Sequence, residues 1–266
     1  LWRKKQNLPN FDFFNFAGIN RPVRLYSTPA SYIEDITLVP SLDGDNGILD
    51  YRIDTAGVDT DAPVRLKIMD ANGNCVAEAA GSAGQLHIPQ ANLWWPYPGT
   101  PYLYQAEVHY GEDCYTEEFG FRTVEVKGTK FLINGKPFYF KGFSKHEDSP
   151  FHGRGLDLCL DVKDINLLHW MNANSFRTSH YPYAEEIYRL CDREGIVIID
   201  ETPAVGIGAE ESCDPYKTFP IREHHEQVVR DLVARDKNHP CVVMWSMGNE
   251  PDTEHFPESA YDYWHS

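Results

Sequence analysis

Four short stretches of the chain place ionisable side chains directly after a run of apolar residues. They read His-Glu-Asp at 146–148, Arg-Thr-Ser-His-Tyr at 177–181, Asp-Glu at 200–201 and Asn-Glu at 249–250. A carboxylate rarely follows a buried strand so closely unless it is paired or takes part in a reaction. Gathered in one place, such carboxylates and histidines could transfer protons to and from a substrate.

The segments before these stretches carry helix and strand patterns in alternation. Apolar residues at helical spacing predict helices at 161–171, 184–194 and 223–238, and Gly195 is well placed to end the second. The first helix should bury one face, formed by Val162, Ile165, Leu168 and Met171.

Strands are predicted between these helices. The predicted strands are one that ends at Gly142 and those at 173–180, 196–200 and 241–246. This alternation implies a parallel sheet with right-handed crossovers, either open or forming half of a (β/α)₈ barrel. Because the carboxyl ends of parallel strands meet at one edge, all four ionisable stretches should lie on the same rim.

The residues before the α/β pattern indicate a second kind of structure. Residues 30–123 contain period-two alternation, for example in 64–68 and 102–110, separated by Gly- and Asn-rich turns. Short strands at this spacing predict a β-sandwich of immunoglobulin type. The aromatic cluster around Trp94 is expected to plug the space between the sheets or against a neighbouring domain.

Composition narrows the possible partners. The net charge of −16 argues against a nucleic acid and against an anionic membrane surface. No run of about 18 apolar residues is present, so no membrane span is expected. Of the six cysteines, Cys75 and Cys114 both fall in the β-rich stretch and could pair if the protein is secreted. The compartment itself stays open.

Motifs for other chemistries are missing from the sequence. Neither a phosphate-binding loop nor a dinucleotide-binding glycine motif occurs, and His-Glu-Gln-Val at 225–228 is followed by Val229 where a zinc protease needs a second histidine. No cofactor and no metal are therefore expected. Paired carboxylates for glycoside hydrolysis fit the four stretches best, since that reaction needs one proton donor and one nucleophile or base.

Three long motifs resemble the β-glucuronidases of glycoside hydrolase family 2. They are KGFSKHEDSPFHGRG, ANSFRTSHYPYAEEIYRLCDREGIVIIDETP and RDKNHPCVVMWSMGNEPDT. The stretch DFFNFAGINRPVRLY also resembles the close of that family's N-terminal jelly-roll domain. The resemblance implies a multidomain β plus α/β chain: jelly-roll strands at 1–29, an immunoglobulin-like sandwich at 30–123 and the first four βα units of a TIM barrel at 124–266.

The resemblance also assigns roles by position. Glu250 matches the general acid/base, and Asn249 matches the residue that hydrogen-bonds the sugar 2-hydroxyl. Asp148 and His180 match contacts to sugar hydroxyls, and Arg177 matches the arginine that supports the nucleophile. The family's nucleophilic glutamate lies at the end of barrel strand seven, past position 266.

An apolar strand running directly into Glu250 would hold this side chain rigidly. We also expect such a position to keep it partly desolvated, which raises the pKa of a carboxyl and lets it hold a proton near neutral pH.

The implied activity is that of a retaining exo-β-glucuronidase acting on a glucuronide small molecule or oligosaccharide. Gly248 stands where many glucuronidases have alanine, and Gly-Asn-Glu is also the wording of β-galactosidases. A β-galactosidase or β-galacturonidase is therefore the alternative enzyme, and a non-catalytic carbohydrate-binding protein is the alternative of another class. Relatives of this kind commonly form homo-oligomers, so an oligomer is expected.

Overall fold

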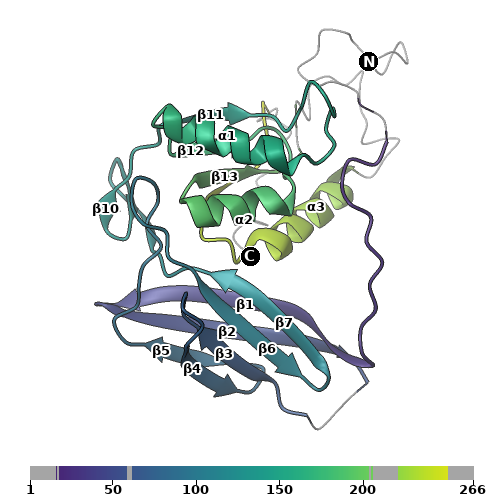
Figure 1. Cartoon of the computed structure of the whole chain (residues 1–266), viewed down its shortest axis with the longest axis vertical. Coiled ribbons are helices and arrows are strands. Elements are labelled where there is room, and N and C mark those ends of the chain that lie inside the picture. The colour runs from purple at the N-terminus through teal and green to yellow at the C-terminus, as the bar shows by residue number, and fades with distance from the viewer. Residues whose placement is uncertain (1–15, 17, 59–61, 204, 206–220, 251–266) are drawn as a thin grey trace.

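The computed structural model describes residues 16, 18–58, 62–203, 205 and 221–250. Figure 1 shows two layers of different construction, an antiparallel β-sandwich and, beside it, a parallel sheet with helices. The boundary between them lies near position 123, where the sequence changes from strand patterns alone to strands that alternate with helices. None of the helices in the described ranges is long and apolar enough to cross a membrane.

The sandwich is formed by two antiparallel sheets. The first has the order β1 (Ser31–Asp43), β2 (Asn46–Gly57), β5 (Ala83–Ile88). The second has the order β4 (Cys75–Ala80), β3 (Arg65–Met69), β6 (Tyr104–Tyr110), β7 (Asp113–Phe119). Seven strands in two packed sheets confirm the predicted sandwich.

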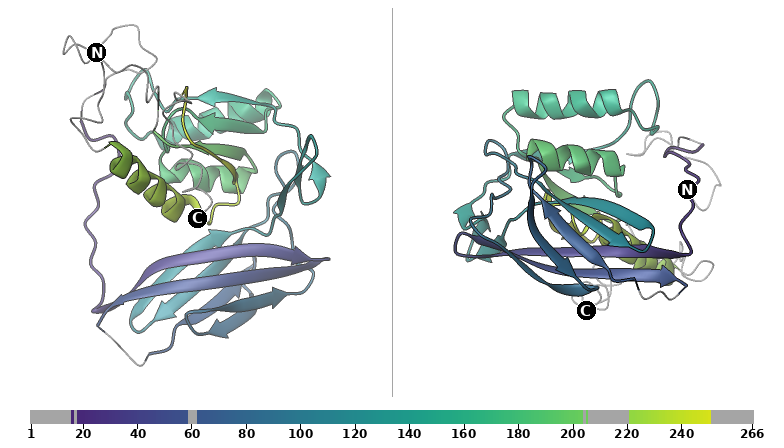
Figure 2. Two further views of the ribbon diagram at one scale, coloured as in Figure 1. Left: turned by 180° about the vertical axis from the view of Figure 1, so that it is seen from behind. Right: turned by 60° about the horizontal axis from the view of Figure 1, so that its bottom comes forward.

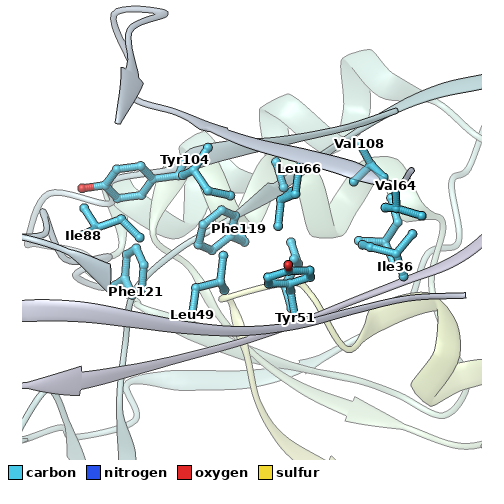
Figure 3. Close-up of a cluster of buried hydrophobic side chains, with 14 of the residues drawn as sticks. Ile36, Leu49, Tyr51, Val64, Leu66, Ile88, Tyr104, Val108, Phe119 and Phe121 are labelled. Atoms are coloured by element: carbon cyan, nitrogen blue, oxygen red, sulfur yellow. The ribbon is translucent and has the colours of Figure 1, made fainter. Parts of the chain in front are cut away.

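Alternation along the strands fills the space between the two sheets. On β3 Leu66 and Ile68 are fully buried, and on β6 Ala106 and Val108 are fully buried opposite them. Figure 3 shows the two sheets contributing side chains to one cluster. Each buried aliphatic or aromatic side chain of this kind stabilises the fold by about 1.5–3 kcal/mol through removal from water.

The possible disulfide between Cys75 and Cys114 is wrong. Both thiols are free and exposed. Cys75 lies on β4 and Cys114 on β7, which are the opposite edges of the four-stranded sheet. Three strand spacings of about 4.8 Å separate these edges, whereas a disulfide needs Cα atoms within about 7 Å.

A small antiparallel sheet links the sandwich to the parallel sheet. It consists of β8 (Val124–Lys127), β9 (Lys130–Ile133) and β10 (Lys136–Pro137). The turn between β9 and β10 uses Asn134 and Gly135, both at positive φ, as the Asn-Gly sequence predicts for a two-residue hairpin.

The parallel sheet has the order β11 (Gly142–Lys145), β12 (Ser175–Thr178), β13 (Val197–Glu201), β14 (Val242–Ser246). Three helices connect these strands: α1 (Leu158–Trp170), α2 (Glu185–Glu194) and α3 (Ile221–Asp236). All three strand pairings are parallel, which confirms the predicted βα succession. Figure 2 shows α1 and α2 side by side on one face of this sheet.

The first parallel strand was predicted one element too early. β11 begins at Gly142, where the predicted strand should end. Pro137 has no N–H and ends β10 after two residues. Gly142 opens the parallel ladder opposite Ser175, and a Cβ at this position would meet the Ser175 carbonyl oxygen at 2.2 Å. Glycine therefore permits the close approach of β11 to β12.

The ends of the helices follow the sequence signals. Asp157 caps α1 by accepting a hydrogen bond from the backbone N–H of Leu160 at 3.1 Å. Gly195 ends α2 in the left-handed conformation at φ 70°, as predicted. On α1, Ile165 and Leu168 are buried, whereas the other two predicted core positions are half exposed, Val162 at 48% and Met171 at 52%.

Buried polar contacts fasten the sandwich to the parallel sheet. Trp94 is fully buried, and its indole Nε1 donates to the Asp192 carbonyl oxygen of α2 at 2.8 Å, so the aromatic plug packs against the neighbouring domain. Arg122 donates to the carbonyl oxygens of Pro240 and Val242, both at 2.6 Å. These bonds hold the start of β14 in place.

Asn238, two residues beyond α3, completes this junction. It accepts from the Leu38 N–H at 3.0 Å and donates to the Ile36 carbonyl at 2.8 Å. It thereby adds a side-chain link to the edge strand β1.

The segment at 18–30 runs as extended chain along the side of the molecule, from the parallel sheet to the sandwich (Figure 1). It contains no strand in its described part. Arg21 pairs with Glu147 at 2.5 Å and Arg24 pairs with Glu186 at 3.0 Å, which ties it to the α/β layer. The assignment of 1–29 to a jelly-roll domain stays a prediction, because 1–15 and 17 lie outside the described residues.

We predict that Arg122→Met destabilises the protein by about 2–3 kcal/mol, because it leaves two buried carbonyl oxygens without their donor. Thermal unfolding of the full-length protein measures this loss. Arg52→Met is the control, since Arg52 is 64% exposed in its side chain and pairs with Asp54 on the surface. That variant should unfold within about 0.5 kcal/mol of the wild type. Equal losses in the two variants would contradict the role of Arg122.

Candidate active site

The four ionisable stretches lie at the carboxyl ends of the four parallel strands. His-Glu-Asp at 146–148 follows β11, and the stretch 177–181 ends and follows β12. Asp200 and Glu201 close β13, and Asn249 follows β14. Because every pairing is parallel, the rim predicted from the sequence is present in the structure.

Three of the predicted site residues form one polar cluster. The guanidinium Nη2 of Arg177 donates to Asn249 Oδ1 at 3.0 Å. The same Nη2 lies 3.0 Å from His180 Nδ1. Arg177 and Asn249 stand 72 positions apart in the sequence, and the parallel register of β12, β13 and β14 brings them together.

Glu201 occupies the centre of this cluster and is fully buried. Its Oε1 lies 2.7 Å from His180 Nδ1, and its Oε2 lies 3.1 Å from Arg177 Nε. Ser246 at the end of β14 donates its hydroxyl to Oε2 at 2.6 Å. The sequence signal was present, since the Asp-Glu pair ends a predicted buried strand, but no specific role for Glu201 could be inferred from it.

Asn249 is held by its backbone as well as by Arg177. An isolated parallel bridge joins it to Val205, which continues the β13–β14 pairing past the end of both strands. The next residue, Glu250, takes a positive φ of 50°. Glu250 therefore projects from a turn four residues beyond β14, and not from the strand itself.

The expected desolvation of Glu250 is wrong for the described residues. The side chain is exposed in this part of the structure. The physical reason is that β14 ends at Ser246, four residues before Glu250, and that Glu250 itself lies in a bend at positive φ. Residues 251–266, which follow it, lie outside the described ranges.

Asp148 lies apart from the cluster formed by Arg177, His180, Asn249 and Glu201. Its Oδ1 is 3.4 Å from Arg154 Nε, and the Arg154 guanidinium stacks 4.1 Å from the Tyr181 ring centre. Asp148 and Arg154 line a cavity of about 930 Å³ between the segment 16–20 and the loop 148–155. Polar side chains thus border a large cavity on the rim near β11.

The neighbouring Glu147 makes structural contacts with other described residues. Its side chain is 6% exposed and accepts from the backbone N–H of Ala184 at 2.8 Å, at the start of α2. Its second oxygen pairs with Arg21. His146 packs edge-on against His180 with ring centres 5.6 Å apart, which adds a contact between the β11 and β12 ends of the rim.

A second buried network lies behind Glu201. Asp200 Oδ1 accepts from the Tyr188 hydroxyl at 2.6 Å and from the Thr178 hydroxyl at 3.1 Å. Thr178 in turn accepts from the Glu201 N–H at 2.9 Å, so it joins the two carboxylate residues. Burial raises the pKa of Asp200 to about 7 from its ordinary 3.8, and the negative charge of Asp236 acts in the same direction.

One group in the described part of the chain has the side-chain types and spacing of metal ligands. Asp192, His239 and Cys241 are buried, with ligand atoms within 4.8 Å of one another. Asp192 already uses both oxygens, pairing with His239 Nδ1 at 2.5 Å and accepting from the Cys241 N–H at 2.9 Å. These bonds belong to the junction with the sandwich, and they do not extend to the rim.

An immunoglobulin-like sandwich followed by a parallel α/β sheet with an ionisable rim defines a multidomain protein of the TIM-barrel class. Residues 124–265 match the model of the glycosyl hydrolases family 2 TIM barrel domain, and residues 31–122 match that of glycosyl hydrolases family 2. The chain belongs to family 2 of the glycosyl hydrolases. This confirms the family and the fold inferred from the sequence motifs.

Similar proteins are known from animals and bacteria. A beta-glucuronidase of Felis catus is 50% identical over 267 residues, covering 96% of this chain and 40% of that protein. A beta-glucuronidase of Paenibacillus borealis is 49% identical over 263 residues, covering 95% of this chain and 43% of that protein. The chain thus spans less than half the length of these relatives.

Solved structures agree with this fold. The Faecalibacterium prausnitzii beta-glucuronidase superposes with a TM-score of 0.87 at 60% identity, covering 98% of this chain and 43% of that one. A Bifidobacterium dentium beta-glucuronidase complexed with coumarin-3-O-glucuronide superposes with a TM-score of 0.86 at 51% identity, covering 98% of this chain and 45% of that one.

The raised pKa of Asp200 has a consequence for stability. Between about pH 4 and pH 7 the folded protein holds a proton on Asp200 that the unfolded chain releases, so the free energy of unfolding falls as pH rises through this window. Asp200→Asn mimics the protonated carboxyl at every pH. We predict that it matches the wild type in melting temperature at pH 5 and exceeds it at pH 8.

Melting curves of the full-length protein across this pH range provide the measurement. Asp54→Asn is the control, because Asp54 pairs with Arg52 on the surface and should leave the pH dependence unchanged. If Asp200→Asn lost stability equally at both pH values, Asp200 would be ionised in the folded protein.

Proposed function

We propose that the full-length protein is a retaining exo-β-glucuronidase that hydrolyses β-D-glucuronides. The observation that carries the proposal is the bond from Arg177 to Asn249, directly before Glu250, at the carboxyl rim of a barrel about 50% identical to beta-glucuronidases. Protonation of a glycosidic oxygen requires a carboxyl group that can give a proton, and Glu250 supplies a carboxyl at this rim.

In the proposed reaction Glu250 acts first as an acid. It gives its proton to the glycosidic oxygen while that oxygen leaves the anomeric carbon with the bonding electron pair. A second carboxylate, expected beyond position 266, forms a bond to the anomeric carbon. Glu250 then acts as a base: it takes a proton from water, and the water oxygen displaces the second carboxylate.

The proposed role of Asn249 depends on the direction of its amide. A guanidinium can only donate, so its contact at 3.0 Å assigns the oxygen of the amide to the Arg177 side. The Nδ2 hydrogens then point elsewhere and can donate to the sugar 2-hydroxyl. Such a bond strengthens as positive charge develops on the sugar ring, so it lowers the barrier more than it improves ground-state binding.

His180 and Asp148 are proposed to bind sugar hydroxyls from two sides of the rim. His180 is largely buried and oriented by Glu201. Asp148 borders the cavity of about 930 Å³, whose described lining residues do not include His180, Asn249 or Glu250. We propose that the sugar lies between this cavity and those residues. A similar beta-glucuronidase has been solved with coumarin-3-O-glucuronide, so we propose aryl glucuronides among the substrates. The expected homo-oligomer stays a prediction.

We predict that Glu250→Gln in the full-length enzyme abolishes hydrolysis of alkyl glucuronides, whose poor leaving groups need a proton. An aryl glucuronide with a good leaving group needs less acid help and should still form the glycosyl-enzyme. This intermediate should accumulate, because no base remains to activate water. Added azide should restore turnover and give the β-glucuronosyl azide, measured by product analysis. Unchanged hydrolysis of an alkyl glucuronide by this variant would exclude Glu250 as the acid.

We predict that Asp148→Ala lowers kcat/KM for aryl glucuronides by about 100-fold or more, with little change in melting temperature. The pair with Arg154 contributes little to stability, since its two atoms are 3.4 Å apart, longer than a normal N–H···O hydrogen bond. Asp157→Ala is the matched control in the same region: it removes the α1 cap and should cost about 1 kcal/mol without lowering kcat/KM. The opposite result, stability lost and activity kept in Asp148→Ala, would assign Asp148 to the fold.

A further inference from the structure

Glu201 lies at the centre of the cluster, although the sequence assigned it no role. Its carboxylate has no exposed surface and faces Arg177 with one oxygen and His180 with the other. A third contact comes from the Ser246 hydroxyl. Its backbone N–H is also fixed, by the bond to Thr178. A carboxylate with three partners, on a bonded backbone at the end of a strand, is held in one orientation.

The contact with His180 orients the imidazole ring. Nδ1 of the ring lies 2.7 Å from Glu201 Oε1 and 3.0 Å from Arg177 Nη2. Both partners approach the same ring nitrogen, so this edge of the ring faces the centre of the cluster. Glu201 thus holds the His180 ring in one orientation.

The contact with Arg177 acts in the same way on the other side. The fixed Oε2 holds the guanidinium at Nε, 3.1 Å away, so that Nη2 reaches Asn249. The charge of Arg177, whose side chain is 32% exposed, offsets much of the cost of burying the Glu201 carboxylate.

We propose that Glu201 is a positioning residue of this active site, which fixes the orientation of the His180 ring and, through Arg177, the amide of Asn249. It touches no reacting atom in this role. The proposal rests on the proposed β-glucuronidase activity, because Asn249 and His180 are the groups that would meet the sugar. The proposal predicts that substitution of Glu201 lowers kcat as well as stability, since Asn249 acts mainly in the transition state.

The chain offers a matched control for a buried carboxylate that holds a histidine. Asp192 is also buried, pairs with His239 Nδ1 at 2.5 Å and accepts from a backbone N–H, but it lies at the junction with the sandwich. Glu201→Gln and Asp192→Asn therefore remove the same kind of interaction from two places. Both should lower the melting temperature of the full-length enzyme.

Only Glu201→Gln should lower kcat for p-nitrophenyl β-D-glucuronide, by about 100-fold with KM within threefold, because a displacement of about 1 Å at a reacting group costs that much. Adding Arg177→Gln to Glu201→Gln should cause little further loss, because both act through the same pair. If Glu201→Gln kept its kcat within threefold, or if the two losses multiplied, the positioning role would be overturned.

Glu201→Asp keeps the buried charge and guards against a variant that fails to fold. It withdraws the carboxylate by about 1.5 Å, the length of one carbon–carbon bond, so kcat should fall on the order of 10- to 100-fold while the protein stays folded. An unchanged kcat in this variant would overturn the proposal. A wild-type enzyme without activity on the glucuronide would instead reject the proposed function, so the two failures are distinguishable.

Discussion

The rim depends on one electrostatic constraint, the burial of the Glu201 carboxylate. A charge without exposed surface costs several kcal/mol unless partners compensate it. Here the compensation comes from three directions: the Arg177 guanidinium, the His180 ring and the Ser246 hydroxyl. Each partner belongs to the end of a neighbouring strand, so satisfying this charge fixes the relative positions of β12, β13 and β14.

A second buried carboxylate serves the boundary between the two layers. Asp192 at the end of α2 bonds to His239 and to the backbone of Cys241, and the carbonyl of the same residue accepts from Trp94 of the sandwich. Burial works against protonation of His239, but the charge and hydrogen bond of Asp192 outweigh it and hold the pKa of this ring above its ordinary value. The start of β14 is thereby attached to the sandwich. This attachment fixes the position of the strand whose other end leads to the rim residues.

The candidate site therefore combines a rigid base with an exposed carboxyl. Arg177, His180 and Asn249 are held by contacts with one another and with buried groups, whereas Glu250 follows at positive φ in a bend and is exposed. This division suits the proposed reaction, because groups proposed to recognise a sugar must not reorganise as the transition state forms. The junction holds the start of β14, the buried charge of Glu201 holds the side chains around it, and the parallel register brings the strand ends together.

The sequence by itself determined the elements and the rim. Apolar periodicity located α2, β13 and β14 within one or two residues. Gly195 marked the end of α2, and Asn134 marked the turn between β9 and β10, through backbone conformations that few residues adopt. It also located Arg177, His180 and Asn249 at strand ends, because polar residues after apolar runs are visible without a structure. It misplaced the start of the first parallel strand, since Pro137 and Gly142 act through neighbours that the local pattern does not contain.

Only the tertiary structure decided which of these residues meet. Arg177 contacts Asn249 across 72 positions, and Asp148 pairs with Arg154 and not with the cluster. Neither contact could be read from strand patterns, because the same pattern is compatible with several registers and loop paths, and a shift of one residue turns a side chain to the other face. The central place of Glu201 followed from its burial, which depends on what surrounds it in space.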